Sequence, residues 1–206
     1  MTFPDTQFTD LSAFMDAYGQ QYESAFGRVD RGAVVAACSA IEKAYLKHRT
    51  VFVCGNGGSA AIANHMVCDH GKLIGTDTGI RVRVQSLCNS NELLTAISND
   101  ITYEDVFAFP LKSMAQPGDV LLTISGSGTS RNIVKAIEAA QGMQLTTIAF
   151  TGFDGGKSGG MSDIHVHVPS DNYGVVEDIH QSLMQIVAQF IRMSHMDPQL
   201  VAERRF

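Results

Sequence analysis

Short apolar runs alternate with longer amphipathic stretches along most of the chain. Five of these runs have the length and composition of β-strands. The predicted strands are Thr50–Cys54, residues 81–87, Val120–Ile124, Leu145–Thr151 and Ile164–Val168. A run in which nearly every residue is apolar, such as Val120–Ile124, is typical of a parallel strand that is covered on both faces.

Amphipathic segments with apolar residues at helical spacing precede and separate these strands. The predicted helices are residues 8–27, 30–48, 59–73, 90–98, 103–115, 130–141 and 174–195. Asp30 is a candidate N-cap for the second helix, and glycine-rich residues 152–160 are predicted to form a loop.

This order of elements predicts parallel strands joined by right-handed crossovers, with helices on both faces of one sheet. We therefore expect an α/β three-layer sandwich with a five-stranded parallel sheet, forming a single domain over residues 1–206. A helical hairpin at 8–48 would pack on the α/β core at 50–195. The hairpin has no strand to cover before Thr50, so it is a candidate oligomer contact.

Composition narrows the class of protein. The 206 residues carry 15 Lys and Arg against 21 Asp and Glu, a net charge of −6, with 45% hydrophobic residues. The chain lacks a long apolar run, a basic leader and a basic cluster, so we expect no membrane segment, no signal peptide and no nucleic-acid partner. Four cysteines without a CxxC pair indicate reduced thiols and a cytoplasmic protein.

A glycine-rich turn, Gly55–Ser59 (GNGGS), lies between the first predicted strand and a helix. Glycines let backbone N–H groups approach a ligand, and a helix start adds partial positive charge. The spacing is not the GxGxxG pattern of dinucleotide-binding proteins. Taken alone, the turn fits a ligand loop and a simple tight connection equally well.

A second turn, Ser125–Ser130 (SGSGTS), follows the strand Val120–Ile124 and opens the next helix. Its four hydroxyl groups and the helix start suit the oxygens of a phosphate monoester. The Walker pattern is absent, which disfavours nucleotide hydrolysis. We favour a phosphate site over a flexible connector, because a buried strand and a helix flank the turn.

Ionisable side chains follow on two of the predicted helices. His65 and Asp69 share a helix face and could bind a metal or form an acid/base pair, although a structural histidine is the alternative. On the last helix, Glu177 and Gln185 are eight residues apart, ~12 Å along the axis. One metal or substrate could hardly meet both from one chain, so we expect different subunits to contribute them if both are used.

Five motifs occur in an order that resembles a known family. They are GNGGSAAIANHMVCD, AISND, PGDVLLTISGSGTSRNIVKAIEAA, LTTIAFTGFDGGK and VVEDIHQSLMQ. Together they resemble the sugar isomerase (SIS) domain, and more narrowly the sedoheptulose 7-phosphate isomerases, also called phosphoheptose isomerases. The resemblance implies a five-stranded parallel sheet between helices and a homotetramer with sites at subunit interfaces.

The resemblance also implies roles for individual residues. Those expected to bind the sugar phosphate are Asn56, Gly57, Gly58, Ser59, Asn99, Asp100, Ser125, Gly126, Ser127, Ser130 and Glu177. The zinc and acid/base positions of the family map onto His65, Asp69, Glu177 and Gln185.

Three of those four positions depart from the family. Asp69 replaces a glutamate, Glu177 replaces a glutamine, and Gln185 replaces a histidine and cannot exchange a proton near neutral pH. His180, near Glu177 on the same helix, is a candidate for the lost role.

The expected reaction is an aldose–ketose isomerisation of a phosphorylated sugar through an enediolate, with sedoheptulose 7-phosphate as the first candidate substrate. Asp69 or Glu177 would be the base, His65 or His180 would move protons between oxygens, and a divalent metal, first of all zinc, would be bound by His65, Asp69, Glu177 and Gln185. The alternative is a non-catalytic SIS protein, such as a sugar-phosphate sensor or a replication-initiator-binding relative. A third possibility is an isomerase of another phosphosugar.

Overall fold

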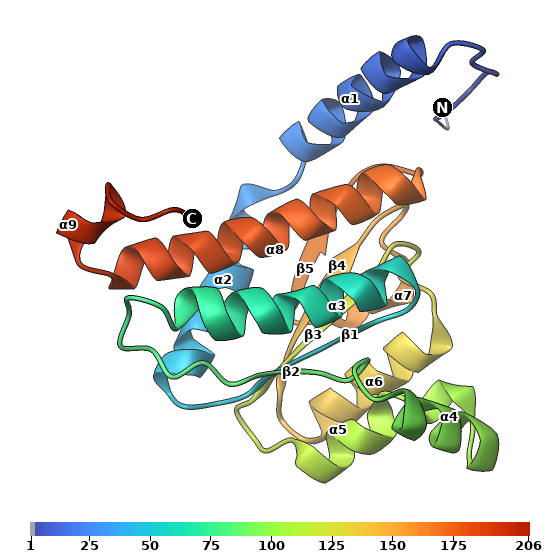
Figure 1. Cartoon of the computed structure of the whole chain (residues 1–206). Coiled ribbons are helices and arrows are strands. Elements are labelled where there is room, and N and C mark those ends of the chain that lie inside the picture. Colours follow the sequence, from blue (N-terminus) through green and yellow to red (C-terminus); the bar gives the residue numbers. More distant parts are fainter. Residues whose placement is uncertain (1–2) are drawn as a thin grey trace.

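The computed structural model describes residues 3–206 and contains one parallel sheet with the strand order β2-β1-β3-β4-β5 (Figure 1). The strands are β1 Val51–Gly55, β2 Val84–Ser86, β3 Val120–Ser125, β4 Thr146–Thr151 and β5 Ile164–His167. Val51 pairs with Val84 on one side and with Val120 on the other. The predicted five-stranded parallel sheet is therefore confirmed.

Helices cover both faces of this sheet (Figure 1). The helices are α1 Leu11–Gly27, α2 Arg31–Leu46, α3 Gly58–Cys68, α4 Asn91–Asp100, α5 Ala108–Met114, α6 Arg131–Gly142, α7 Gly156–Met161, α8 Tyr173–His195 and α9 Pro198–Val201. One layer contains α2, α3 and α8, and the other contains α5, α6 and α7. This is the predicted three-layer arrangement.

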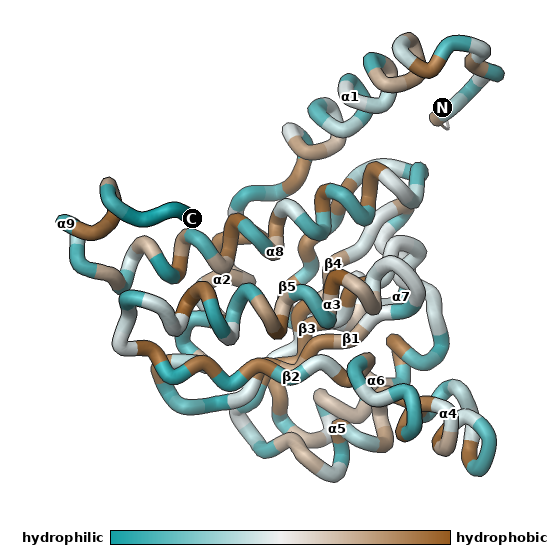
Figure 2. Tube along the Cα trace, in the orientation of Figure 1, coloured by the Kyte–Doolittle hydropathy of each residue, from teal (hydrophilic) through white to brown (hydrophobic). Residues whose placement is uncertain are grey.

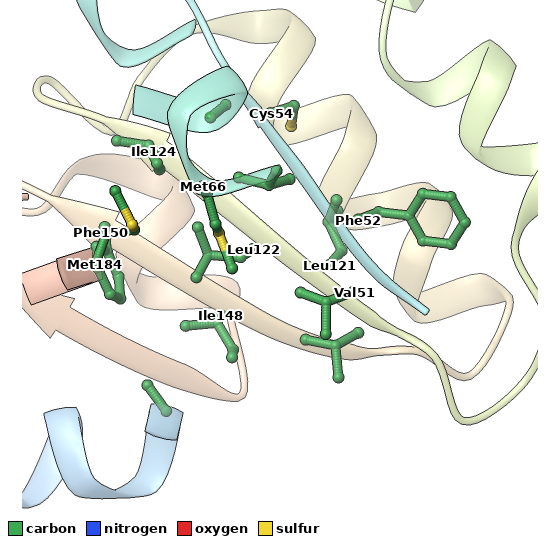
Figure 3. Close-up of a cluster of buried hydrophobic side chains, with 14 of the residues drawn as sticks. Val51, Phe52, Cys54, Met66, Leu121, Leu122, Ile124, Ile148, Phe150 and Met184 are labelled. Atoms are coloured by element: carbon green, nitrogen blue, oxygen red, sulfur yellow. The ribbon is translucent and has the colours of Figure 1, made fainter. Parts of the chain in front are cut away.

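The core lies between each layer of helices and the sheet. Every residue of β1 and β3 is buried, as the continuous apolar runs predict. Met66 of α3 and Met184 of α8 meet Leu122 and Phe150 of the sheet (Figure 3). The brown central strands and mixed outer helices of Figure 2 show the same division. Within the described residues, no helix is both long and apolar enough to cross a membrane.

Several predicted elements have different bounds in the structure. The helix predicted at 59–73 is α3 followed by a π-helical segment at Asp69–Ile74. The predicted loop at 152–160 contains the short helix α7. The strand predicted at 81–87 shrinks to three residues, and the helix predicted at 103–115 starts as a 3₁₀ turn at Tyr103–Asp105.

The first two helices follow one another as predicted, but they pack differently. Helix α2 lies on the sheet and on α8, whereas α1 leans away from the body of the molecule and touches α8 (Figure 1). The Tyr18 hydroxyl donates to Asp178 over 2.6 Å, and the Tyr22 and Ser182 hydroxyls are 2.7 Å apart. Leu11 and Met15 stay 73% and 64% exposed.

Candidate functional site

The strand order places a topological switch point between β1 and β3. These strands are neighbours, yet the helices that follow them, α3 and α6, lie on opposite faces of the sheet. Ligands of open α/β sheets bind at such a point, beyond the carboxyl ends of the strands. The two predicted ligand turns follow β1 and β3 and therefore lie side by side.

The GNGGS turn has a backbone that requires glycine. Gly57 has φ +55° and ψ −123°, which L-residues rarely adopt. Gly55 lies directly against Ser59, so a side chain at position 55 would collide with it. A side chain at Gly58 would collide with the carboxylate of Glu177. Close packing therefore determines the shape of the turn. The carboxylate of Glu177, which belongs to α8, lies against the start of α3.

The SGSGTS turn is pre-organised by its own hydroxyls. Gly128 N–H donates to Ser125 Oγ over 3.2 Å, and the Thr129 hydroxyl donates to Ser127 Oγ over 3.2 Å. Ser130 is the N-cap of α6 but makes no capping bond through its side chain, which leaves that hydroxyl for a ligand. The turn thus combines hydroxyls with a helix start, as phosphate binding requires.

A second glycine loop packs against the SGSGTS turn, which we call the phosphate turn after its predicted ligand. Gly152 N–H donates to the carbonyl of Gly126 over 2.8 Å. A side chain at Gly128 would collide with Gly155, and one at Gly156 would collide with the backbone of Ser127 and Gly128. The predicted loop at 152–160 therefore positions the phosphate turn, a role that the sequence did not indicate.

A reciprocal amide pair joins the two ligand turns. Asn56 Nδ2 donates to Asn132 Oδ1, and Asn132 Nδ2 donates to Asn56 Oδ1, both over 2.9 Å. Asn132 is 2% exposed. The Tyr103 hydroxyl adds a third bond to Asn56 Oδ1 over 3.0 Å. Sequence reasoning missed Asn132 and Tyr103, because a helical asparagine and a surface tyrosine carry no pattern of their own.

Helices α3 and α8 form a polar seam, which we define as His65 and Asp69 facing Gln181 and Gln185. His65 Nε2 lies 3.0 Å from Asp69 Oδ2, and Gln181 Nε2 lies 3.2 Å from His65 Nδ1. Gln185 donates an N–H to Asp69 Oδ2 as well. If Gln181 donates to Nδ1, the imidazole is neutral and its Nε2–H points at Asp69. The predicted pairing of His65 with Asp69 on one helix face is confirmed.

Glu177 lies on the same chain, two turns before Gln185. Its carboxylate faces Gly58 rather than Asp69. Burial and the neighbouring Asp178 carboxylate raise the pKa of Glu177. Glu177 and Gln185 are thus far apart, as predicted, but neither needs a second subunit to reach α3.

His180 lies outside the polar seam, so its proposed takeover of the lost histidine's role is not supported. The side chain is fully buried against the sheet, and Nε2 lies 3.1 Å from the carbonyl oxygen of Thr151. Burial lowers the pKa of His180 to about 4. Within the described residues, the one hydrogen bond of this imidazole goes to the sheet and not to the seam or the two ligand turns.

Three other predicted ligand residues lie away from the centre of the candidate site, either buried beneath it or on the surface beside it. Ser59 is 3% exposed, because it packs beneath Gly55. Asn99 and Asp100 end α4 on the surface, where Asn99 Nδ2 donates to Asp100 Oδ1 over 2.8 Å. The nearest described link from this segment to the ligand turns is Tyr103, three residues later.

The predicted metal ligands do not fit a zinc site within one chain. His65, Asp69 and Gln185 come together, but Glu177 faces Gly58. Among residues 3–206, no three His, Cys, Asp or Glu side chains gather closely enough to hold a metal ion. One imidazole, one carboxylate and one amide fall short of the ligands that zinc prefers. Zinc stays a prediction.

Comparison with known proteins assigns this architecture to a family. Residues 17–152 match the description of the SIS domain. The chain belongs to the SIS domain family. A phosphoheptose isomerase from Alteromonas mediterranea is 36% identical to this SIS chain over 143 residues, which are 68% of this chain and 72% of that protein.

Solved structures and a further relative extend the comparison. The phosphoheptose isomerase GmhA from Neisseria gonorrhoeae has a TM-score of 0.80 and 28% identity, covering 88% of the SIS chain and 96% of GmhA. The DnaA initiator-associating protein DiaA from Yersinia pestis is 35% identical over 162 residues, 77% of this chain and 82% of DiaA. The predicted resemblance to SIS proteins of the phosphoheptose isomerase type is confirmed.

Proposed function

We propose that this SIS protein is an aldose–ketose isomerase of a phosphorylated sugar, and specifically of sedoheptulose 7-phosphate. The observation that carries the proposal is the position of Glu177, whose carboxylate faces Gly58 at the start of α3, beside the predicted phosphate turn. An ionisable group is thereby held beside the turn that would bind the phosphate. The similarity to named phosphoheptose isomerases supports the same substrate.

The phosphate turn would bind and orient the substrate. Hydroxyls of Ser125, Ser127 and Ser130 and the N-terminus of α6 would hold the phosphate oxygens. Asn56 would bind sugar hydroxyls from the neighbouring turn, together with Asn99 and Asp100 at the rim. Fixing both ends of the substrate leaves the reacting carbons beside Glu177 and the polar seam.

Glu177, Asp69 and His65 would then move two protons. Glu177 or Asp69 takes the proton from the carbon next to the carbonyl, and the C–H electrons form the enediolate double bond. The same carboxyl group returns the proton to the neighbouring carbon. His65 would take a proton from one enediolate oxygen at Nδ1 and return it to the other, with the substrate replacing Gln181 at this nitrogen and Asp69 holding Nε2. No step of this mechanism requires a bound metal.

A homotetramer is part of the proposal. Large apolar side chains on α1, α2 and α8 are exposed in the single chain; they are Leu11, Met15, Val35, Ile186 and Phe190. Apolar surface of this extent typically marks a subunit contact. Such a contact would lie next to the polar seam, since α8 carries both.

Proton exchange with solvent tests the proposed reaction. In deuterium oxide, sedoheptulose 7-phosphate should gain deuterium at the carbon next to the carbonyl, and the aldose phosphate should accumulate. Asp69→Asn should lower the rate by at least about a hundredfold, because general acid–base groups contribute 10²–10⁴-fold. Wild-type rates in this variant would remove Asp69 from the chemistry.

A non-catalytic interaction protein is the second candidate. Two observations favour it: the similarity to DiaA, and Gln185, which cannot replace a histidine in proton transfer. Under this alternative, sedoheptulose 7-phosphate would bind without any deuterium entering the sugar. Exchange at a rate above the protein-free control would exclude it.

A further inference from the structure

A cavity of about 550 Å³ lies at the amino-terminal edge of the sheet, where β3 and β4 begin. Its lining includes Ser39, Lys43, Lys47, Arg49, Gly118 and Thr146. The SGSGTS turn follows the opposite end of β3, which is six residues long, about 17 Å away at the strand rise. The cavity is therefore separate from the candidate isomerase site.

Three cations converge on this cavity. Lys43 and Lys47 are one helical turn apart and lie on the same side of α2, and the Arg49 side chain packs against Gly118. Within the described residues, none of the three takes part in an ion pair. Like charges at this helical spacing repel each other. The molecule as a whole is acidic, with a net charge of −6.

The dipole of α2 explains only part of this cluster of positive side chains. The negative end of the α2 dipole favours a cation at Lys43 or Lys47, but Arg49 lies beyond the helix. Glu42 precedes Lys43, but its carboxylate pairs with His195 over 2.7 Å and does not line the cavity. Asp119 follows Gly118, and its carboxylate accepts from the N–H groups of Thr50 and Gln116, each over 2.8 Å. It is 4% exposed and absent from the cavity lining, so the three cations face the cavity without an acid among its lining residues.

We propose that this cavity binds a pyrophosphate-bearing organic molecule of nucleotide size. Lys43, Lys47 and Arg49 would hold the charged oxygens, and the hydroxyls of Ser39 and Thr146 would add hydrogen bonds. The volume falls within the 300–1,000 Å³ that is usual for small-molecule sites. Small apolar side chains in the lining, Ala40 and Val120, leave room for the organic part. This site does not depend on the proposed isomerase activity.

Calorimetric titration of the full-length protein with adenosine diphosphate, pyrophosphate and adenosine tests the site. We expect both phosphorylated probes to bind at least about tenfold more tightly than adenosine, and to weaken as salt is added. Lys43→Gln/Lys47→Gln should weaken adenosine diphosphate by about tenfold or more and leave the isomerase rate unchanged. Lys112→Gln, which removes a lysine from the last turn of α5, is the matched control and should bind as the wild type does.

A second variant separates this cavity from the phosphate turn. Ser127→Asp places a negative charge in that turn and should block sugar phosphate there, while adenosine diphosphate still binds. Three results would each overturn the proposal: no binding at about 1 mM probe, equal affinity in the double lysine variant, or loss of binding in Ser127→Asp. Because the readout is binding, failure here is distinct from failure of the proposed isomerase.

Discussion

At the scale of single residues, Asn132 and Glu177 determine how the candidate site is arranged. Asn132 is a buried amide that holds Asn56 by two hydrogen bonds, so the first ligand turn depends on a residue from the second. Glu177 carries an acid to the start of α3. Asn132 acts through Asn56 and is a positioning residue, whereas Glu177 is a candidate for contact with the substrate.

Asn132→Asp should disturb the turn without changing its shape. One of the two amide bonds becomes a repulsive contact between oxygens, and a buried carboxylate is left without a donor for its second oxygen, which costs about 1–3 kcal/mol. We expect KM for the sugar phosphate to rise more than kcat falls, and the unfolding midpoint to drop. Asn91→Asp, at the exposed start of α4, is the control. An unchanged KM would show that Asn132 does not position Asn56.

Glu177→Gln should change both the melting temperature of the protein and the pH dependence of its reaction rate. The raised pKa of Glu177 means that its ionised form is disfavoured in the folded protein. Its contribution to stability is therefore present at low pH and lost as the pH rises through that pKa. The variant should melt at a higher temperature than the wild type at pH 7, and at a similar temperature near pH 4.

If Glu177 is the base, the same variant should lose at least about a hundredfold in kcat. The wild-type rate should fall on the acid side at a pH above the usual range of a glutamate. Glu23→Gln, on the exposed face of α1, should change neither the melting temperature nor the profile. A wild-type rate in Glu177→Gln would leave Asp69 as the base.

At the scale of elements, the hydrophobic periodicity of the sequence predicted where the candidate site lies more accurately than it predicted where each helix or strand begins and ends. The strands and both ligand turns follow from apolar runs and glycine patterns, and i, i+4 spacing predicted the contact between His65 and Asp69. The π-helical segment after Asp69 was not predictable, because it depends on a tertiary contact. His70 is buried there and lies 2.8 Å from the Tyr45 hydroxyl of α2.

The sequence also did not predict which side of α8 packs against α3. Gln181 and Gln185 occupy one stripe of α8, but nothing local indicates which helix that stripe meets. The same uncertainty led to the incorrect placement of His180, which is on the stripe that faces the sheet. Such assignments require the relative rotation of two helices, which only packing determines.

The polar seam makes a prediction about metal binding. Gln185→His would place a second imidazole beside His65 and Asp69, so that three side chains of ligand types that zinc prefers lie together. After dialysis against chelator-free buffer, this variant should retain zinc at least about tenfold more tightly than the wild type. Gln189→His, one turn further along α8, should not. Equal zinc retention in both variants would contradict the prediction, taken from the family resemblance, that the metal ligands lie in this seam.

At the scale of the whole molecule, large apolar side chains are exposed on α1 and on α8, which carries one side of the seam. Helix α1 leans outward with Leu11 and Met15 uncovered, and α8 exposes Ile186 and Phe190. A fold whose sheet is fully covered has no internal use for these side chains. Assembly of several copies would bury them.

Light scattering after size-exclusion chromatography should give the mass of four chains. Phe190→Glu should lower that mass, because the side chain is 52% exposed in the single chain and a charge there opposes burial between copies. Its far-ultraviolet circular dichroism should remain that of the wild type. Asn91→Glu adds the same charge elsewhere and should stay tetrameric. A monomeric wild type would refute the proposed assembly.

The two sides of the polar seam are 116 residues apart in the chain. During synthesis, both turns that recognise the sugar phosphate leave the ribosome well before α8, which is among the last elements to emerge. The growing polypeptide therefore acquires its recognition elements, with His65 and Asp69, early, and Glu177 and the α8 side of the seam late. Catalytic competence is in this way tied to completion of the carboxyl-terminal segment, and a prematurely ended product would lack Glu177, Gln181 and Gln185.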